Sequence, residues 1–419
     1  MSKASIITIG DELLIGQVID TNSAWMAQEL NKHGIAVGRR VAVGDAWDEI
    51  WRALDEESAA ADIILITGGL GPTSDDITKP LLCKYFAGNM VTNEAALANV
   101  KYLFAEVFKR EITPRNILQG EVPDVCTVLQ NSVGTAPGMV FTKGEKIFVS
   151  MPGVPFEMQQ MMATDVIPML KQKFDFPHIA HKTLLTFGVG ESFIADILAS
   201  FESNLPTHIK LAYLPNYGMV RLRLSSTGRE MQTTNDEIDR YFETLQNLVR
   251  PYLVVTEDIR MQNVVAQLLQ KHQKTLCTAE SCTGGYISHL ITAIPGSSLF
   301  YDGSVISYSY KAKEDLLQVK KQTLEMFGAV SEEVVKEMAA GALQNIHSNY
   351  TIAVSGIMGP DGGMEGKPVG TVWVAVGNNK KLETKKFRFR FARQRNIELT
   401  AVNALNMLRE FILAYEEAP

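Results

Sequence analysis

The chain has few of the features that mark extracellular or membrane proteins. Its 419 residues contain four cysteines, Cys83, Cys126, Cys277 and Cys282, which are too few and too scattered for a disulfide framework. No apolar run approaches the roughly 20 residues that a membrane-spanning helix needs. The first residues lead directly into an apolar, strand-like segment and lack the pattern of a signal peptide. These absences predict a protein of the reducing cytoplasm.

Positive charge is also scarce. The chain has 40 lysines and arginines against 47 aspartates and glutamates, which gives a formal net charge of −7. Such a balance repels a polyphosphate backbone, so binding to nucleic acids is disfavoured. No internal period of roughly 20 to 50 residues recurs, which argues against a repeat array. The remaining composition is globular, with 46% hydrophobic residues, and the length predicts two or three domains.

Residues 1–170 alternate strand-like and helix-like segments. Strands are expected over 4–9, 37–43, 62–67 and 146–150. A helix over 23–33 has a candidate N-cap at Thr21 or Asn22, and Gly34 fits its C-terminal end. Residues 63–66 form an unbroken apolar row, which is typical of a strand buried on both faces. We therefore expect one α/β domain with a parallel sheet and helices on each side.

Two further regions follow. Residues 171–255 indicate a small α+β module with a turn at Gly188–Gly190 before a short helix, a half-exposed strand over 220–224 and a helix over 237–248. The turn is compatible with phosphate or nucleic-acid contact, but the acidity of the chain favours a simple connection. Residues 256–419 indicate a second α/β domain. Its expected helices cover 261–272 and the segment after Ser331, and its expected strands cover 275–279, 303–308, 350–355, 371–376 and 386–391.

The N-terminal domain contains a glycine-rich turn directly after a buried strand, TGGLGPTSDDIT over residues 67–78. Its glycines allow the backbone to approach a ligand, and their N–H groups are suited to holding a phosphate. Asp75 and Asp76 follow at once, and carboxylates beside a phosphate require a divalent cation between the like charges. The alternative is a plain strand-to-helix turn with an acidic helix start.

Three more loops favour the functional interpretation. They are GDELLIGQVIDTN (10–22), NSVGTAPG (131–138) and PGVPFE (152–157). Ligands of open α/β sheets bind beyond the carboxyl ends of the strands, so we expect these loops to gather at one edge of the sheet.

In the C-terminal domain, the segment AESCTGG over 279–285 follows a strand and opens a helix. This is a suitable place for a nucleophile and for an oxyanion hole made of backbone N–H groups. Ser281, Cys282 and Thr283 compete for the role, and chemistry alone favours the thiol. The alternative for Cys282 is a small buried residue in a strand-to-helix turn.

Three other segments add polar groups to this domain. YSYKAK (308–313) brings a phenol and two amines to the end of a strand, SGIMGPDGG (355–363) with KPVGT (367–371) supplies glycine-rich loops, and FARQR (391–395) supplies two arginines. Solvated lysines, a long surface loop and surface arginines are the alternatives for these three segments.

Together these motifs resemble the CinA family. The resemblance covers the whole chain, and segments such as TGGLGPTSDDIT and PGVPFEM are far more specific than a lone glycine-rich loop. The N-terminal domain resembles the molybdopterin-binding MoaB/MogA fold, the middle module is KH-like, and the C-terminal domain resembles PncC-type deamidases.

The resemblance implies a bifunctional hydrolase of pyridine nucleotide recycling, as a homodimer. The N-terminal domain is expected to cleave ADP-ribose to AMP and ribose 5-phosphate with a divalent metal ion. The C-terminal domain is expected to convert nicotinamide mononucleotide to nicotinic acid mononucleotide and ammonia without a cofactor. Two other classes stay open: a module that only binds molybdopterin or a nucleotide, and a competence- or DNA-damage-associated factor, which the acidic balance disfavours.

The resemblance also assigns roles to single residues. The expected catalytic residues of the C-terminal domain are Ser281, Tyr308, Lys313, Ser355 and Arg395. Ser281 is the nucleophile, Tyr308 and Lys313 activate it, Ser355 replaces the family's usual threonine, and Arg395 lies on the phosphate side. Serine–lysine pairs perform such chemistry on other folds. Lys311 in the same segment stays an alternative base.

In the N-terminal domain, Asp76 matches the family's functional aspartate after the glycine turn, and Asp45 matches its second aspartate. Asp76, Asp75 and Asp45 are the expected metal ligands. The expected substrate-binding residues are Gly284, Gly285, Gly356, Gly359, Gly370 and Thr371 in the C-terminal domain, and Gly68, Gly69, Gly71, Thr73, Gly134 and Gly153 in the N-terminal domain.

Overall fold

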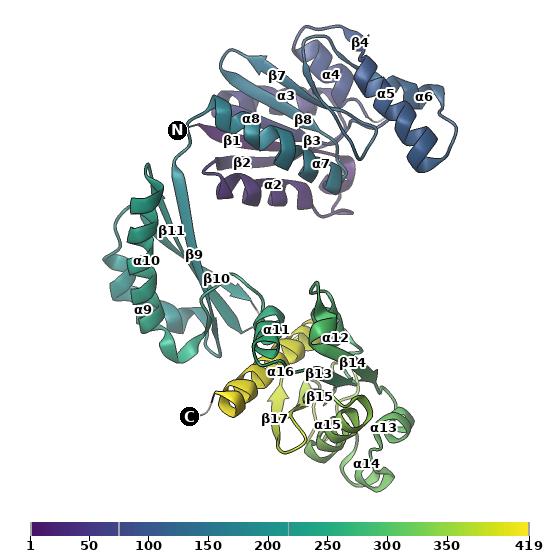
Figure 1. Ribbon diagram of the computed structural model, residues 1–419, viewed down its shortest axis with the longest axis vertical. Helices are drawn as coiled ribbons and strands as arrows, with labels where there is room; N and C mark the ends of the chain where they lie inside the picture. Colours follow the sequence, from purple (N-terminus) through teal and green to yellow (C-terminus); the bar gives the residue numbers. More distant parts are fainter. Residues whose placement is uncertain (1, 74–75, 217, 418–419) are drawn as a thin grey trace. The chain divides into compact units, whose positions relative to one another are not determined.

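The computed structural model describes residues 2–73, 76–216 and 218–417, and these form two compact units of mixed α/β structure (Figure 1). The first unit combines the described residues up to His181 with Ser225–Ile238, and the second combines Lys182–Leu224 with those from Asp239 onward. Among the described residues, no helix is both long and apolar enough to cross a membrane.

The N-terminal sheet has six strands in the order β2-β1-β3-β8-β7-β6. Their bounds are β1 Lys3–Ile9, β2 Ala36–Val43, β3 Ile63–Thr67, β6 Thr127–Leu129, β7 Gly138–Lys143 and β8 Lys146–Met151. The first four in the sheet order are parallel, as predicted, whereas β7 and β6 are antiparallel. The expectation of a wholly parallel sheet was therefore wrong, because the short connection between β7 and β8 permits only a hairpin.

Helices cover both faces of this sheet. Their bounds are α1 Asp11–Leu14, α2 Thr21–Lys32, α3 Trp47–Ala60, α4 Thr78–Tyr85, α5 Glu94–Tyr102, α6 Pro114–Ile117, α7 Pro155–Met161 and α8 Ile167–Lys173, and β4 Met90–Thr92 pairs with β5 Glu121–Pro123 beside them. Ile63 and Leu65 of β3 pack with α2, α7 and α8, and Ile64 and Ile66 pack with α3 and α4 on the opposite face. The apolar row in β3 is thus buried on both faces, as predicted.

Helix α2 begins two residues before the predicted start. The side chain of Asp20 accepts a hydrogen bond from the Ser23 amide at 2.9 Å, so Asp20 is the N-cap rather than Thr21 or Asn22. This earlier cap includes Asn22 in the helix, where its amide donates to the Gly153 carbonyl at 2.7 Å and connects α2 to the loop after β8.

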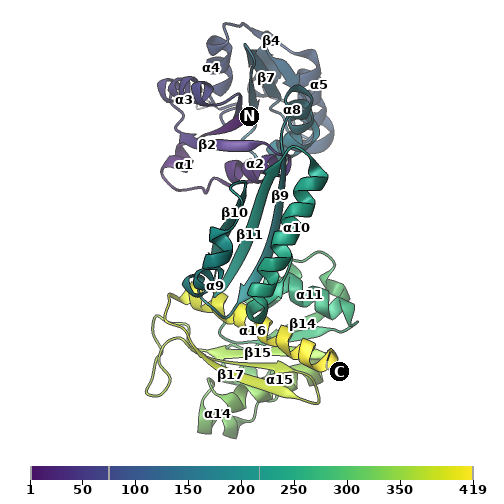
Figure 2. The same ribbon diagram turned by 90° about the vertical axis from the view of Figure 1, so that its left-hand side faces the viewer.

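The middle of the chain forms a four-stranded sheet in the order β10-β11-β9-β12, and Figure 2 shows β10, β11 and β9 side by side. The elements are β9 His178–Phe187, α9 Glu191–Ser203, β10 Ile209–Asn216, β11 Met219–Gly228, α10 Met231–Leu248 and β12 Leu253–Val255. Both helices are longer than predicted. The polar first turns of α10 showed no apolar spacing, so its start at Met231 could not be read from periodicity.

The C-terminal sheet has five strands in the order β14-β13-β15-β16-β17. Their bounds are β13 Leu276–Glu280, β14 Tyr301–Ile306, β15 Tyr350–Gly356, β16 Thr371–Gly377 and β17 Leu382–Arg388. Strands β14, β13 and β15 are parallel, and β16 and β17 continue the sheet antiparallel. The last strand starts four residues earlier than predicted, because its hairpin register pairs Gly377 with Leu382 and Thr371 with Arg388.

Helices also cover both faces of this second sheet. They are α11 Met261–Lys271, α12 Tyr286–Thr292, α13 Tyr310–Leu317, α14 Lys321–Phe327, α15 Glu332–Ile346 and α16 Arg393–Glu416. Helices α11, α12 and α16 share one hydrophobic core with the sheet, and α13, α14 and α15 share a second core on its other face.

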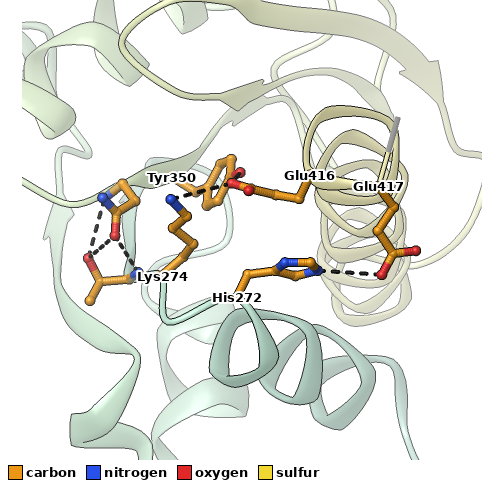
Figure 3. A network of polar contacts seen from close by, with 7 residues as sticks. His272, Lys274, Tyr350, Glu416 and Glu417 are labelled. Atoms are coloured by element: carbon orange, nitrogen blue, oxygen red, sulfur yellow. Dashed lines mark hydrogen bonds and ion pairs between the residues drawn. The ribbon is translucent and has the colours of Figure 1, made fainter. Parts of the chain in front are cut away.

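A polar network fixes the C-terminal end of α16 (Figure 3). Glu416 accepts a hydrogen bond from the Tyr350 hydroxyl at 2.5 Å and lies 3.6 Å from the Lys274 ammonium. Glu417 forms an ion pair with Lys271 and lies 3.4 Å from the His272 ring nitrogen. The other end of the 24-residue helix α16 has its own contacts, because Arg393 donates to the Gly359 carbonyl at 2.8 Å and Asn396 donates to the Met358 carbonyl at 3.0 Å.

Candidate active site

Ser281 lies immediately beyond the carboxyl end of β13, in the turn that opens α12. Its amide donates a hydrogen bond to the Val354 carbonyl of β15 at 3.1 Å, so the central strands of the sheet fix its main chain. The residue is only 7% exposed.

The partner of Ser281 is Lys313, which reaches it from helix α13. The Lys313 Nζ lies 2.8 Å from the Ser281 Oγ, 2.7 Å from the Ser307 carbonyl oxygen and 3.4 Å from the Tyr308 carbonyl oxygen. Lys313 is 1% exposed, and burial lowers its pKa from 10.5 to about 8.

This geometry accommodates both the ammonium and the neutral amine of Lys313. An uncharged amine has two N–H bonds and one lone pair, whereas the ammonium has three N–H bonds. The carbonyls of Ser307 and Tyr308 can take the two hydrogens, so the lone pair of the neutral form is directed at the Ser281 hydroxyl. The arrangement can therefore remove the proton of Ser281 as a general base, and the lowered pKa supplies that form near neutral pH.

Cys282 is the neighbour that chemistry alone favoured as nucleophile. The side chain is 6% exposed and belongs to the hydrophobic core shared by α11, α12 and α16, although it also contributes to the wall of the pocket described next. Burial raises the pKa of its thiol to about 12, so the thiol stays protonated at neutral pH. The structure therefore favours Ser281 over Cys282.

A cavity of about 250 Å³ opens beside Ser281 and Lys313. It is lined by Ser281, Cys282, Tyr308, Lys313, Ala329, Val330, Ser355, Gly356, Ile357, Met358, Gly359, Asp361, Gly362 and Arg393. The sequence had not indicated Ala329 or Val330, which come from a loop without a distinctive motif, and it had assigned no role to Asp361 of the SGIMGPDGG segment.

Two predicted residues have other positions than expected. The phenol of Tyr308 is 65% exposed and lies 3.4 Å from the Arg393 guanidinium, so only the main-chain carbonyl of Tyr308 contacts Lys313. Arg395 lies outside the cavity, with its guanidinium 4.8 Å from the centre of the Phe391 ring. The arginine of the cavity is Arg393, which donates to the Gly359 carbonyl at 2.8 Å. The motif FARQR contains both arginines. Which of the two faces the cavity depends on where helix α16 begins, and it begins at Arg393.

Ser355 lines the cavity, and its hydroxyl donates to the Ala329 carbonyl at 2.7 Å. It therefore holds the Ala329–Val330 wall in place. Gly356 and Gly359 also line the cavity, as expected. Gly370 and Thr371 do not: Gly370, with φ of 86°, packs against the Phe389 carbonyl, and the Thr371 hydroxyl donates to the Pro368 carbonyl at 2.7 Å.

Gly284 and Gly285 do not line the cavity either. The Gly284 amide donates to the Ser281 carbonyl at 3.2 Å, and the Gly285 amide donates to the Glu280 carboxylate at 3.1 Å. Because both amides are already paired within the protein, this turn does not offer them to a substrate phosphate.

A second cavity, of about 410 Å³, lies at the carboxyl ends of the parallel strands in the N-terminal domain. It is lined by Ile9, Gly10, Glu12, Asp45, Gly68, Gly69, Leu70, Gly71, Pro72, Asp76, Gln119, Thr135, Ala136, Pro152, Gly153, Val154 and Glu157. The four predicted loops therefore gather at one edge of the sheet. Thr73 and Gly134 are not among the lining residues. A side chain at Gly134 would collide with Glu157, so this glycine makes room for a lining carboxylate.

Asp76 is bound by the glycine turn that precedes it. One carboxylate oxygen accepts from the Gly71 amide at 2.8 Å, and the other accepts from the Thr73 amide at 2.8 Å and the Thr73 hydroxyl at 2.5 Å. Asp45 lies at the same cavity, and its carboxylate accepts from the Asp11 amide at 3.0 Å.

Among the described residues, no three histidine, cysteine, aspartate or glutamate side chains are grouped to hold an ion. Both oxygens of Asp76 already accept hydrogen bonds, and Asp75, the third expected ligand, lies outside the described residues.

Comparisons with known proteins cover all three regions of the chain. Residues 5–172 match the family model "Probable molybdopterin binding domain", residues 181–254 match "Damage-inducible protein CinA KH domain", and residues 258–412 match "CinA C-terminal domain". The "CinA-like protein" of Cytophaga hutchinsonii is 44% identical, over 97% of each chain. That of Flavobacterium psychrophilum is 43% identical, over 98% of this chain and 99% of its own.

A solved structure is similar to part of the chain. The crystal structure of a competence-damaged protein (CinA) superfamily member from Klebsiella pneumoniae is 36% identical and covers 37% of this chain and 97% of its own, with a TM-score of 0.36.

The buried lysine should oppose folding, and this can be measured. Its pKa lies below the unfolded value, so the penalty is complete below pH 8 and disappears as the pH rises towards 10.5. A shift from 10.5 to about 8 corresponds to about 3 kcal/mol. We expect Lys313→Met to raise the free energy of unfolding of its domain at pH 7 by roughly 1–3 kcal/mol, and the gain to shrink above pH 8. Calorimetric melting of both proteins across this range tests the sign, and a less stable variant at pH 7 would contradict it.

Proposed function

This chain belongs to the CinA family, and on that premise we propose that its C-terminal domain is a serine amidohydrolase. The proposed reaction converts nicotinamide mononucleotide to nicotinic acid mononucleotide and ammonia. The single observation that supports it most is the 2.8 Å contact between Ser281 and a buried lysine whose pKa is about 8, at the wall of a cavity.

The chemistry follows from this contact. The neutral amine of Lys313 takes the Ser281 proton as the serine oxygen bonds to the carboxamide carbon. The resulting ammonium returns the proton to the nitrogen, the C–N bond breaks, and ammonia leaves. Water then attacks the acyl-serine by the same route in reverse and releases the acid. We propose that a main-chain amide of the turn after Ser281 donates a hydrogen bond to the oxyanion.

The lowered pKa removes most of the barrier that a lysine base would otherwise add. At pH 7.4, a lysine with a pKa near 10.4 is neutral in roughly one molecule in a thousand, whereas a pKa of about 8 leaves roughly one in five neutral. The difference corresponds to about 3 kcal/mol of activation free energy.

The cavity suits a mononucleotide. Ile357 and Met358 give it apolar walls for a flat ring, while Arg393 brings a positive charge that suits a phosphate. At about 250 Å³ it is a small site, of a size for one nucleotide rather than two.

A protein that only binds a nucleotide is the alternative, and the buried lysine argues against it. Burial of Lys313 opposes folding, so a structural role would be better filled by an apolar side chain. Strongly shifted titrating groups beside a cavity are typical of active sites.

The nucleophile can be tested by replacing each of the two neighbours. We expect Ser281→Ala to abolish release of ammonia from nicotinamide mononucleotide, because among the described residues Ser281 supplies the only side-chain hydroxyl within hydrogen-bond distance of the Lys313 amine. Cys282→Ala should lower kcat less than about threefold, since its thiol is protonated and packed in the core. Activity that survives in Ser281→Ala but is lost in Cys282→Ala and after thiol alkylation would reverse the assignment.

The base can be tested against the neighbouring amine of the same helix. Lys313→Met should lower kcat by roughly three orders of magnitude or more with little change in KM, because it removes proton transfer rather than binding. Lys311→Met is the matched control: Lys311 is exposed and pairs with Asp315 at 3.1 Å, so its loss should change little. In the wild type, kcat/KM should rise with pH with an apparent pKa near 8. A large kcat loss confined to Lys311→Met would move the base to that residue.

For the N-terminal domain, we propose cleavage of ADP-ribose to AMP and ribose 5-phosphate. The cavity is lined by the carboxylates of Glu12, Asp45, Asp76 and Glu157, and such a surface repels a bare diphosphate. A divalent ion that arrives bound to the diphosphate neutralises this repulsion, so the substrate is the metal complex. A domain that only binds a pterin or a nucleotide stays the alternative.

Asp76 provides the test of this second activity. Its carboxylate holds the turn at Gly71 and Thr73, so Asp76→Ala should release the turn and reduce ADP-ribose cleavage at least 100-fold, while deamidation in the other domain stays unchanged. Removal of divalent ions with a chelator should have the same selective effect. Full cleavage of ADP-ribose in chelator would contradict the proposed metal complex.

A further inference from the structure

Glu280 is a buried carboxylate directly beside the proposed nucleophile. It is the last residue of β13, and its side chain is 0% exposed. Its main-chain carbonyl accepts from the Ser307 amide at 2.8 Å, which joins β13 to the end of β14. The proposed reaction gives this carboxylate no part, so its burial needs another explanation.

The side chain of Glu280 turns back over the segment that contains Ser281. It accepts hydrogen bonds from the Thr283 hydroxyl at 2.6 Å, the Gly285 amide at 3.1 Å, the Ile287 amide at 3.1 Å and the Ser288 amide at 2.8 Å. One carboxylate thus ties the end of a strand to the turn that follows and to the first turn of α12.

The position suits a side chain with two acceptor oxygens. Its two oxygens meet five donors, namely the hydroxyls of Thr278 and Thr283 and the amides of Gly285, Ile287 and Ser288. A glutamine would place an amide N–H₂ against those N–H donors and would leave some of them buried without an acceptor. Replacement by Gln is therefore a small change in volume and a large change in the hydrogen bonding of the turn.

The shape of this turn determines whether Ser281 stays within hydrogen-bond distance of Lys313. The two residues come from different elements, the turn after β13 and helix α13, so their 2.8 Å contact requires that the turn keep its shape. The Ser281 amide fixes one side of the residue to β15, and the Glu280 carboxylate fixes the segment that follows it.

We propose that Glu280 is a positioning residue that keeps Ser281 within hydrogen-bond reach of Lys313. The inference rests on the proposed serine–lysine chemistry. A purely structural role would lower the stability of the domain and leave the rate of the folded protein unchanged, whereas a positioning role lowers the rate of the folded protein.

The experiment compares Glu280→Gln with a matched control in the same domain. Glu337 also accepts from a main-chain amide, that of Lys320 at 2.8 Å, and from the Thr323 hydroxyl at 2.9 Å, but it does so at the start of α14 and does not line the cavity. Glu337→Gln therefore repeats the chemical change away from Ser281. Both variants of the full chain are measured well below their melting temperatures.

Two rates are followed in each protein. The first is kcat for nicotinamide mononucleotide. The second is the labelling of Ser281 by a fluorophosphonate, in which the serine oxygen bonds to phosphorus, fluoride leaves, and the serine proton passes to Lys313; mass spectrometry locates the label. Labelling needs the Ser281–Lys313 geometry but not the natural substrate, so it tests positioning even if the proposed substrate is wrong.

We expect Glu280→Gln to lower both rates roughly 10- to 100-fold with KM within about twofold, and Glu337→Gln to keep both within about twofold. Wild-type rates in Glu280→Gln would overturn the proposal. A wild-type protein that does not release ammonia, but whose labelling slows in Glu280→Gln, would refute the substrate and support the positioning role.

If Glu280→Gln does not melt cooperatively, Thr283→Val replaces it, because it removes the 2.6 Å hydrogen bond alone. A labelling rate at least threefold lower then supports the proposal, and an unchanged rate overturns it.

Discussion

The contact between Lys313 and Ser281 requires the lysine side chain to be buried, and elements from much of the C-terminal domain contribute to this burial. The amine reaches the serine from helix α13, and the carbonyls of Ser307 and Tyr308 receive its other hydrogens. Burial lowers its pKa to about 8 and thereby opposes folding, while it favours the neutral form that the proposed reaction needs. The two hydrophobic cores on either face of the sheet must supply the stability that the site removes.

Both sites follow from one topological constraint. Parallel strands end at the same edge of a sheet, so residues that are distant in sequence meet there. In the C-terminal domain these are Ser281 after β13, Ser307 after β14 and Ser355 in β15; in the N-terminal domain they are the loops after β1, β2, β3 and β8. The antiparallel strands at the other side of each sheet contribute no described residue to the lining of either cavity.

In both glycine-rich turns, a carboxylate of the chain itself accepts hydrogen bonds from the main-chain amides. Their amides suggested phosphate cradles, yet in each turn a carboxylate of the chain itself occupies several of them: Asp76 at Gly71 and Thr73, and Glu280 at Gly285, Ile287 and Ser288. A helix or turn that is rich in N–H groups attracts an anion, and here a side chain is that anion. These amides are therefore already paired within the protein, and the substrate phosphate of the proposed reaction would be met by other groups, such as Arg393.

The sequence by itself determined the α/β class, the positions of the buried strands and the segments that form both cavities, because apolar runs and glycine-rich turns are local patterns. It also proposed Ser281 and Lys313, through the motifs that resemble the CinA family. Tertiary structure decided what depends on contacts between segments. The antiparallel direction of β7 and the register of β17 follow from hairpin pairing. The place of Arg393 rather than Arg395 at the cavity follows from where α16 begins and how it is fixed. Burial raises the pKa of the Cys282 thiol and lowers the pKa of Lys313. This burial depends on the whole core, which no single segment specifies.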